Sequence, residues 1–208
     1  MTYDISLTPE AFTLVKFDAA ELLAIAQAAA DAVGVPAGTK IDIEVDEALP
    51  HPLIASAVEV GDGTMSLWFS GGSFEDSKRQ AMLTPEGSLM ELSSAFLRGR
   101  DRLDGGFEDA PEDGALSERQ RVIWDTYTEG RLHRQGGYLI NEPRRRYSYR
   151  LQCGFNDVAD AEYERLWGGG TATLSWAELE EIEGRVAAAD PRPEAKKSLR
   201  NETLRISS

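Results

Sequence analysis

The sequence predicts an α+β fold, in which a small, mostly antiparallel sheet is packed by four or five helices. Alternating polar and apolar residues indicate strands early in the chain, and apolar residues three and four apart indicate helices after them. The hydrophobic content of 41% is sufficient for a packed core in a chain of 208 residues. We expect residues 1–189 to form a single α+β domain, followed by a loosely held tail, 190–208.

The first helix is predicted over residues 18–33. Asp18 can cap its N-terminus, and Gly34 and Pro36 can end it. The residues expected on its buried side are Leu22, Ile25, Ala29 and Val33. Residues 8–17, which precede it, are compatible with either a helix or a strand.

Strands are predicted over residues 40–47, 53–60 and 64–69. In the first of these, Ile41, Ile43 and Val45 alternate with Asp42, Glu44 and Asp46, which is typical of a half-buried strand. The sequence GDG at 61–63 is a hairpin signal between the other two. Residues 41–70 are therefore expected to form a small meander.

The rest of the chain is predicted to be mainly helical, with helices over 84–103, 117–135, 156–167 and 175–186. Capping boxes are expected at Ser117 with Gln120 and at Ser175 with Glu178. Residues 144–155 alternate, and this pattern predicts a strand or an extended segment.

Charge is unevenly distributed along the chain. There are 36 acidic and 22 basic side chains, and residues 1–77 contain 13 of the acidic but only two of the basic ones. The acidic part can be a solvated surface, or it can repel nucleic acid and favour a basic partner.

Several features predict a cytoplasmic protein. The single cysteine, Cys153, cannot form an intramolecular disulfide, and residues 1–12 do not resemble a signal peptide. The alanine-rich stretch near 22–33 is interrupted by polar residues, so we expect no membrane span. The oligomeric state is left open.

No known catalytic or cofactor motif is present. The two histidines, His51 and His133, are far apart, so we expect no metal site and no cofactor. The acidic loop at 104–114 lacks the glycine that an EF-hand needs at its sixth position. The glycine clusters at 70–76 and 168–170 match no phosphate-binding or nucleophile motif and are expected to be turns.

The basic cluster INEPRRRYSYR at 140–150 is the main candidate site, either for an anion or for a partner. In an extended chain Arg145, Tyr147 and Tyr149 would share one face. The net charge of −14 opposes nucleic-acid binding, so we favour ion pairs within the protein or with a protein partner. The candidate residues are Arg100, Arg144, Arg145, Arg146, Tyr147, Tyr149 and Arg150.

Three functions remain open from the residues alone. The first is a non-catalytic cytoplasmic protein-interaction domain that uses its acidic surface or the arginine segment. The second is a hydrolase or transferase in which Arg100, Arg144 and Arg146 hold an anionic substrate beside a carboxylate. The third is a phosphate or RNA binder.

The order of elements over residues 18–103 resembles that of small bacterial zincin-like metallopeptidases. A helix is followed by IDIEVDEALP, by strands ending in SLWFSGG, and by a long helix. In that family the long helix carries HExxH, with zinc-binding histidines and a glutamate base. Here it reads SLMELSSAFLRGRDRL and has no histidine, so no catalytic residue can be assigned. The resemblance therefore implies the fold without the protease, and it does not extend beyond residue 104.

Overall fold

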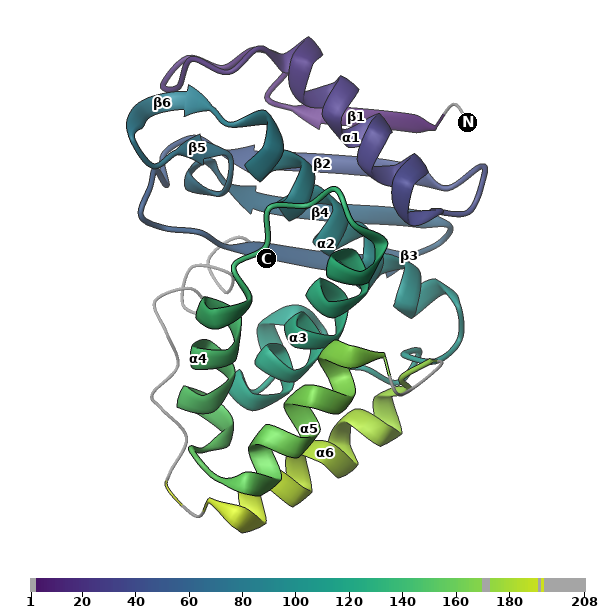
Figure 1. The fold of residues 1–208 in the computed structure, drawn as a ribbon. Coiled ribbons are helices and arrows are strands. Elements are labelled where there is room, and N and C mark those ends of the chain that lie inside the picture. Colours follow the sequence, from purple (N-terminus) through teal and green to yellow (C-terminus); the bar gives the residue numbers. More distant parts are fainter. Residues whose placement is uncertain (1–2, 170–172, 191, 193–208) are drawn as a thin grey trace. The chain divides into compact units, whose positions relative to one another are not determined.

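The computed structural model of the chain describes residues 3–169, 173–190 and 192. It divides into two compact units (Figure 1), residues 1–100 and 101–208, here called unit 1 and unit 2. The described part contains six strands and six α-helices, which confirms the α+β class.

The predicted domain boundaries are not decided by this division. A single domain over residues 1–189 stays a prediction. The predicted tail at 190–208 lies outside the described residues except for Asp190 and Arg192.

Unit 1 is built on a four-stranded sheet of order β1-β2-β4-β3. The strands are β1 (Asp4–Thr8), β2 (Lys40–Asp46), β3 (Ser56–Gly61) and β4 (Thr64–Ser70). β1 pairs with β2 and β2 with β4 in parallel, and only β3 and β4 are antiparallel. The sheet is therefore mixed, and the prediction of a mostly antiparallel sheet was wrong.

The expected meander was wrong for a related reason. The β3–β4 hairpin forms around the predicted GDG turn. However, β3 does not pair with β2. The position beside β2 is occupied by β4, and β3 lies on the other side of β4. Local alternation shows that each strand exists, but it does not choose the neighbouring strand.

The crossover that makes β1 and β2 parallel is helix α1 (Ala19–Val33). As predicted, the Asp18 side chain accepts from the amides of its first turn, and Gly34 ends it in the left-handed conformation (φ 69°). The buried residues of α1 are Leu22, Ala26, Ala29, Ala30 and Val33, while Ile25 is half-buried. Strand β1 was not predicted. Its alternation covers only Asp4–Thr8, and residues 8–17, which follow, had been left open between helix and strand.

Two short strands, β5 (Glu75–Asp76) and β6 (Arg79–Leu83), precede helix α2 (Pro85–Leu103). α1 and α2 lie on the same side of the four-stranded sheet (Figure 1). Gly99 allows α2 to approach closely, because a Cβ there would lie 2.5 Å from the side chain of Met65 on β4. One side of the sheet is thus the core of unit 1.

Unit 2 is helical. It contains α3 (Glu118–Gln135), α4 (Glu142–Cys153), α5 (Asp157–Gly168) and α6 (Trp176–Ala189). Both predicted capping boxes are confirmed, at the N-termini of α3 and α6. Aromatic rings fill the core, with Phe107 stacked on Trp124 at 4.4 Å between centroids.

Helix α4 corrects the prediction of an extended segment and brings the number of helices above the expected four or five. Asn141 caps it by accepting from the amide of Arg144, and Pro143 occupies its first turn. Tyr149 and Cys153, four residues apart, are both buried. A helix is favoured over a strand here because the helical period buries these two side chains together, whereas a strand would also have turned Tyr147 inward.

Candidate functional site

The candidate residues of α4 are sorted by the helix into an inner and an outer side. Tyr149 is fully buried, whereas Tyr147 is 57% exposed. The expectation that both tyrosines and Arg145 share one face was therefore wrong, because it assumed a period of two. Burial also raises the pKa of Cys153 to about 12, so this thiol is not an activated nucleophile.

Arg145 lies on the inner side and is held by two carboxylates of α3. Its Nε donates to Oε2 of Glu129 at 2.8 Å, and its Nη2 donates to Oε1 of the same carboxylate. Its Nη1 lies 3.6 Å from Oδ2 of Asp125. Glu129 is only 8% exposed, so this bidentate pair replaces the water that its carboxylate would otherwise need.

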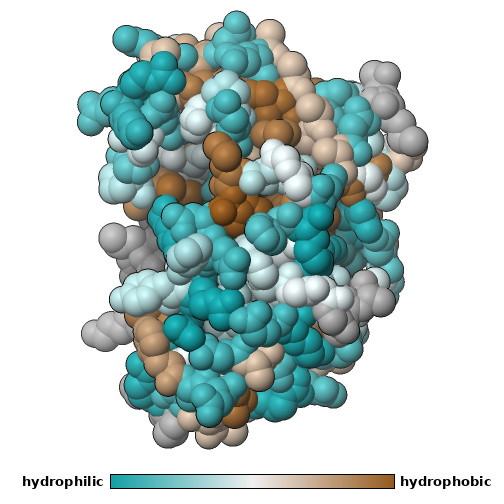
Figure 2. Space-filling view, viewed as in Figure 1, coloured by the Kyte–Doolittle hydropathy of each residue, from teal (hydrophilic) through white to brown (hydrophobic). Residues whose placement is uncertain are grey.

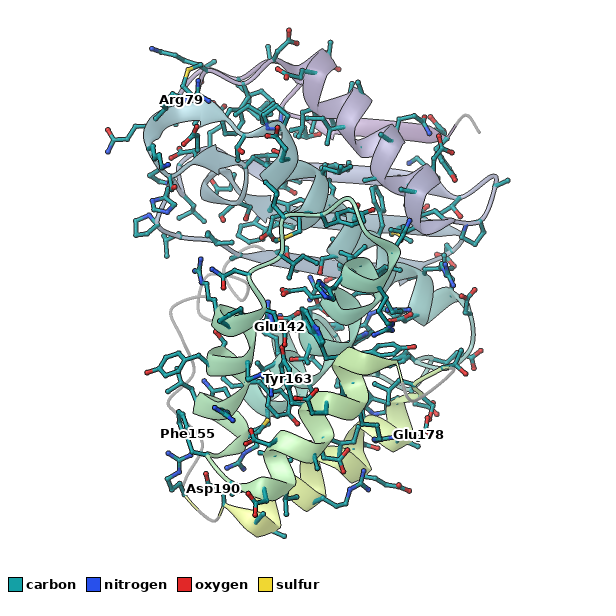
Figure 3. All side chains as sticks on the ribbon, in the orientation of Figure 1. Arg79, Glu142, Phe155, Tyr163, Glu178 and Asp190 are labelled. Atoms are coloured by element: carbon teal, nitrogen blue, oxygen red, sulfur yellow. The ribbon has the colours of Figure 1, made fainter. Side chains whose placement is uncertain are left out.

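Arg146 pairs with carboxylates of both α4 and α5. It pairs with Glu142 at 3.1 Å and with Glu164 at 2.6 Å, and its guanidinium lies 4.4 Å from the ring centroid of Tyr163. Figure 3 labels Glu142 and Tyr163, which lie near each other between α4 and α5. Burial disfavours the charge of Arg146, but hydrogen bonds with Glu164 and Glu142 outweigh it and raise its pKa.

Arg150 ties α4 to α5. Its Nε and Nη2 each donate to one oxygen of Asp160, both at 2.7 Å. The hydrogen bond from Arg150 is the main cause that lowers the pKa of Asp160. Both side chains are about one third exposed, so the pair is only partly screened by water.

The remaining two arginines of the candidate set lie elsewhere. Arg144 is exposed on α4. Arg100 belongs to unit 1, where its Nη1 donates to the carbonyl of Val33 at 2.6 Å and satisfies the end of α1. Anion or partner binding by the whole set stays a prediction, and its inner members serve as internal counter-charge.

The outer side of α4 and the short connection after it carry an apolar stripe that was not predicted from the sequence. Tyr147, Leu151 and Phe155 follow one another at intervals of four residues and are 57%, 46% and 57% exposed. The rings of Tyr147 and Phe155 meet edge to face at 6.1 Å. Val158, at the start of α5, continues the exposed apolar series at 41%. These four residues are called the α4 stripe below.

Figure 2 shows the setting of the α4 stripe. Hydrophilic atoms cover most of unit 2 in this view, and a small apolar patch lies at the lower left, where Figure 3 labels Phe155. The helical spacing of Tyr147 and Leu151, four residues apart, is present in the sequence. It was overlooked because the segment was predicted to be extended, with a period of two.

The second exposed surface is the side of the four-stranded sheet opposite α1 and α2, here called the outer sheet face. In β2 the buried residues Ile41, Ile43 and Val45 alternate with Asp42, Glu44 and Asp46, as predicted. Register places the outward side chains in cross-strand rows. The exposed or half-buried residues of this face are Asp4, Ser6, Thr8, Lys40, Asp42, Glu44, Asp46, Ala57, Glu59, Gly61, Thr64 and Ser66.

Hydroxyls and carboxylates dominate the outer sheet face. Ser6 Oγ donates to Asp42 Oδ1 at 2.6 Å, and this bond, followed by that from Lys40, lowers the pKa of Asp42. Trp68, on the same side, is only 9% exposed, so it adds little apolar surface. Glu44 and Glu59 are exposed acids and present negative charge to the solvent.

Other acidic residues have structural tasks. Glu47 accepts hydrogen bonds from the amides of Thr13, Leu14 and Val15 and so holds the segment after β1. In the acidic loop considered for calcium, Asp113 is 1% exposed and pairs with Arg102 at 2.8 Å. Part of the loop's charge is therefore used inside unit 2.

Among residues 3–169, 173–190 and 192, no group of three or more histidine, cysteine or acidic side chains is arranged to hold a metal ion. His133 packs against the ring of Trp167, at 5.0 Å between centroids. None of the described helices is both long and apolar enough to cross a bilayer.

Comparisons with protein-family models, with curated proteins and with solved structures find no match to this chain. The resemblance to zincin-like metallopeptidases accordingly stays a prediction.

Proposed function

We propose that this chain is a non-catalytic protein-interaction domain whose outer sheet face binds a basic protein partner. The observation that carries the proposal is the asymmetry of the sheet in unit 1. One side is covered by α1 and α2, and the other presents carboxylates and hydroxyls from all four strands.

Charge determines the kind of partner. Residues 1–77 contain 13 acidic and two basic side chains, and Glu44 on β2 and Glu59 on β3 stand exposed on either side of β4. Complementary charge speeds the encounter of two proteins and excludes like-charged partners. A basic protein or a basic segment therefore fits this face, whereas nucleic acid would be repelled.

The ion pairs of α4 support this proposal over the alternative of a hydrolase or transferase with an arginine pocket. Of the arginines assigned to that pocket, Arg146 is paired with Glu142 and Glu164, and Arg100 donates to the carbonyl of Val33. Arg145 and Arg150 are paired with carboxylates of unit 2 as well. An anionic substrate would have to displace these partners. The cytoplasm is kept as the proposed location, on the basis of the single cysteine, Cys153.

The proposal is tested by charge reversal on the outer sheet face. Glu44→Lys with Glu59→Lys is compared with Glu180→Lys and Glu181→Lys, which make the same change of charge on exposed residues of α6. The wild type should capture a basic protein in stoichiometric amount from an extract of its source. Purified, that protein should bind in a salt-sensitive manner, with at least tenfold weaker binding to the sheet variant and unchanged binding to the α6 variant.

Two results would overturn it. If both variants weaken binding equally, the attraction is due to net charge and not to this face. If no basic protein is captured, the outer sheet face has no such partner.

A further inference from the structure

We propose that the α4 stripe is a homodimer interface, in which α4 of one copy packs antiparallel to α4 of a second copy around a two-fold axis near Leu151. This interface lies in unit 2 and is separate from the outer sheet face.

The first argument is that the apolar side chains cannot turn inward. The inner side of α4 is held by the bidentate pairs of Arg145 with Glu129 and of Arg150 with Asp160. Tyr149 and Cys153 are fully buried on that side. Rotation of the helix would break these pairs, so Tyr147, Leu151 and Phe155 remain in contact with water unless another surface covers them.

The second argument is the order of charges along the stripe. Arg144, at the N-terminal end of α4, is exposed, and Asp157, beside Val158 at the other end, is exposed as well. The stripe is therefore positive at one end, apolar in the middle and negative at the other end. A uniformly acidic or uniformly basic partner would meet like charge at one end.

A second copy meets this pattern with opposite charge at both ends. When two such stripes are placed antiparallel about Leu151, Tyr147 faces Phe155 of the second copy, and the end that carries Arg144 faces the end that carries Asp157, at the start of α5. The same contacts occur twice, as a two-fold axis requires. The aromatic centre supplies the apolar burial, and the charged ends set the direction of pairing.

The test is sedimentation of the full chain over a range of concentrations. The wild type should show a reversible monomer–dimer equilibrium. Leu151→Arg should abolish the dimer, because it places two like charges next to each other on the axis. Leu139→Ser, which removes an exposed leucine outside the stripe, should leave it unchanged.

Charge exchange gives the decisive result. Arg144→Asp alone and Asp157→Arg alone should each weaken the dimer about tenfold, because each replaces two attractions by two repulsions. The double variant should restore it. An equimolar mixture of the two single variants should form a heterodimer, since each end of one chain then meets its opposite on the other. Circular dichroism should show that all variants keep the wild-type helix content.

A monomeric wild type at every concentration would overturn the proposal. So would a dimer that tolerates Leu151→Arg, or a mixture of the single variants that associates no better than either one alone.

Discussion

The outer sheet face of unit 1 and the interior of unit 2 use acidic side chains in opposite ways. On the outer sheet face of unit 1, Glu44 and Glu59 remain in water, where their charges cost little and act on the surroundings. In unit 2, Glu129 and Asp113 are buried and hold arginines. The difference shows that net charge alone does not locate a binding surface, because some of the charged side chains are paired with each other inside the protein.

The largest difference between the units should appear when one partner of a buried pair is removed. Arg145→Gln should lower the free energy of unfolding by about 3 kcal/mol, because the carboxylate of Glu129 stays buried without its partner. The matched change Arg144→Gln, on an exposed arginine, and Glu44→Gln, on the outer sheet face, should each change it by less than about 0.5 kcal/mol. Denaturant unfolding at a concentration where the chain is monomeric measures all three.

A second variant separates the pair from the packing of the arginine. Arg145→Gln with Glu129→Gln should recover a large part of the loss, since neither group is then a buried lone charge. Equal effects of Arg145→Gln and Arg144→Gln would show that the pair contributes nothing and would remove the contrast between the units.

Close helix packing in unit 2 predicts the next effect. A Cβ at Gly130 of α3 would lie 2.9 Å from the Cα of Trp167 on α5. Gly130→Ala should therefore cost about 1–3 kcal/mol through displacement of the two helices. Gly184→Ala on α6, where a Cβ meets nothing within 4 Å, should stabilise by about 0.5–1 kcal/mol. Thermal unfolding midpoints should move in opposite directions, and a shared direction would contradict the packing seen at Gly130.

A smaller effect is expected at the start of α6. Ser175→Ala removes the side chain that accepts from the amide of Glu178 and should cost about 1 kcal/mol. Ser175→Gly should cost only a few tenths of this amount relative to the wild type, because glycine is a tolerated cap. The comparison of the two denaturation midpoints distinguishes the lost cap from a general effect of shortening the side chain. Identical midpoints for the wild type and Ser175→Ala would rule out a stabilising cap.

The smallest effect concerns pH. The pKa of Asp160 is lowered by Arg150, so its contribution to stability is present above the ordinary pKa of about 4 and is lost as the pH falls through the lowered value. Because both groups are about one third exposed, the contribution should be less than about 1 kcal/mol. Arg150→Gln should reduce the slope of unfolding free energy against pH in acid and leave that slope unchanged near neutrality. A slope in acid equal to that of the wild type would show that the pair does not act through Asp160.

Local signals predicted much of the fold. Asp18, Ser117 and Ser175 cap α1, α3 and α6 as expected. Gly34 lies at the C-terminal end of α1, and Gly136 lies at that of α3. The alternation in β2 correctly separated its buried and outward side chains. These features depend on neighbouring residues in the chain, so they can be read from it directly.

The candidate site was less predictable. The arginine segment was recognised, but its period was read as two, and so Tyr147 was placed beside Tyr149. The start of the helix has a local signal that was overlooked, the Asn141 cap with Pro143 in the first turn. The ion pairs of Arg145 and Arg150 and the burial of Tyr149 depend on α3 and α5. No local pattern indicates those partners.

The sequence by itself determined the acidic character of the chain, the N-terminal caps of α1, α3 and α6, and the inward side of β2. The tertiary structure alone decided that β4 lies beside β2, that Arg145 faces Glu129, and that Tyr147, Leu151 and Phe155 face the solvent. The physical reason is range. Caps and alternation are set by residues close in the chain, whereas strand order, ion pairing and burial depend on groups that only folding brings together.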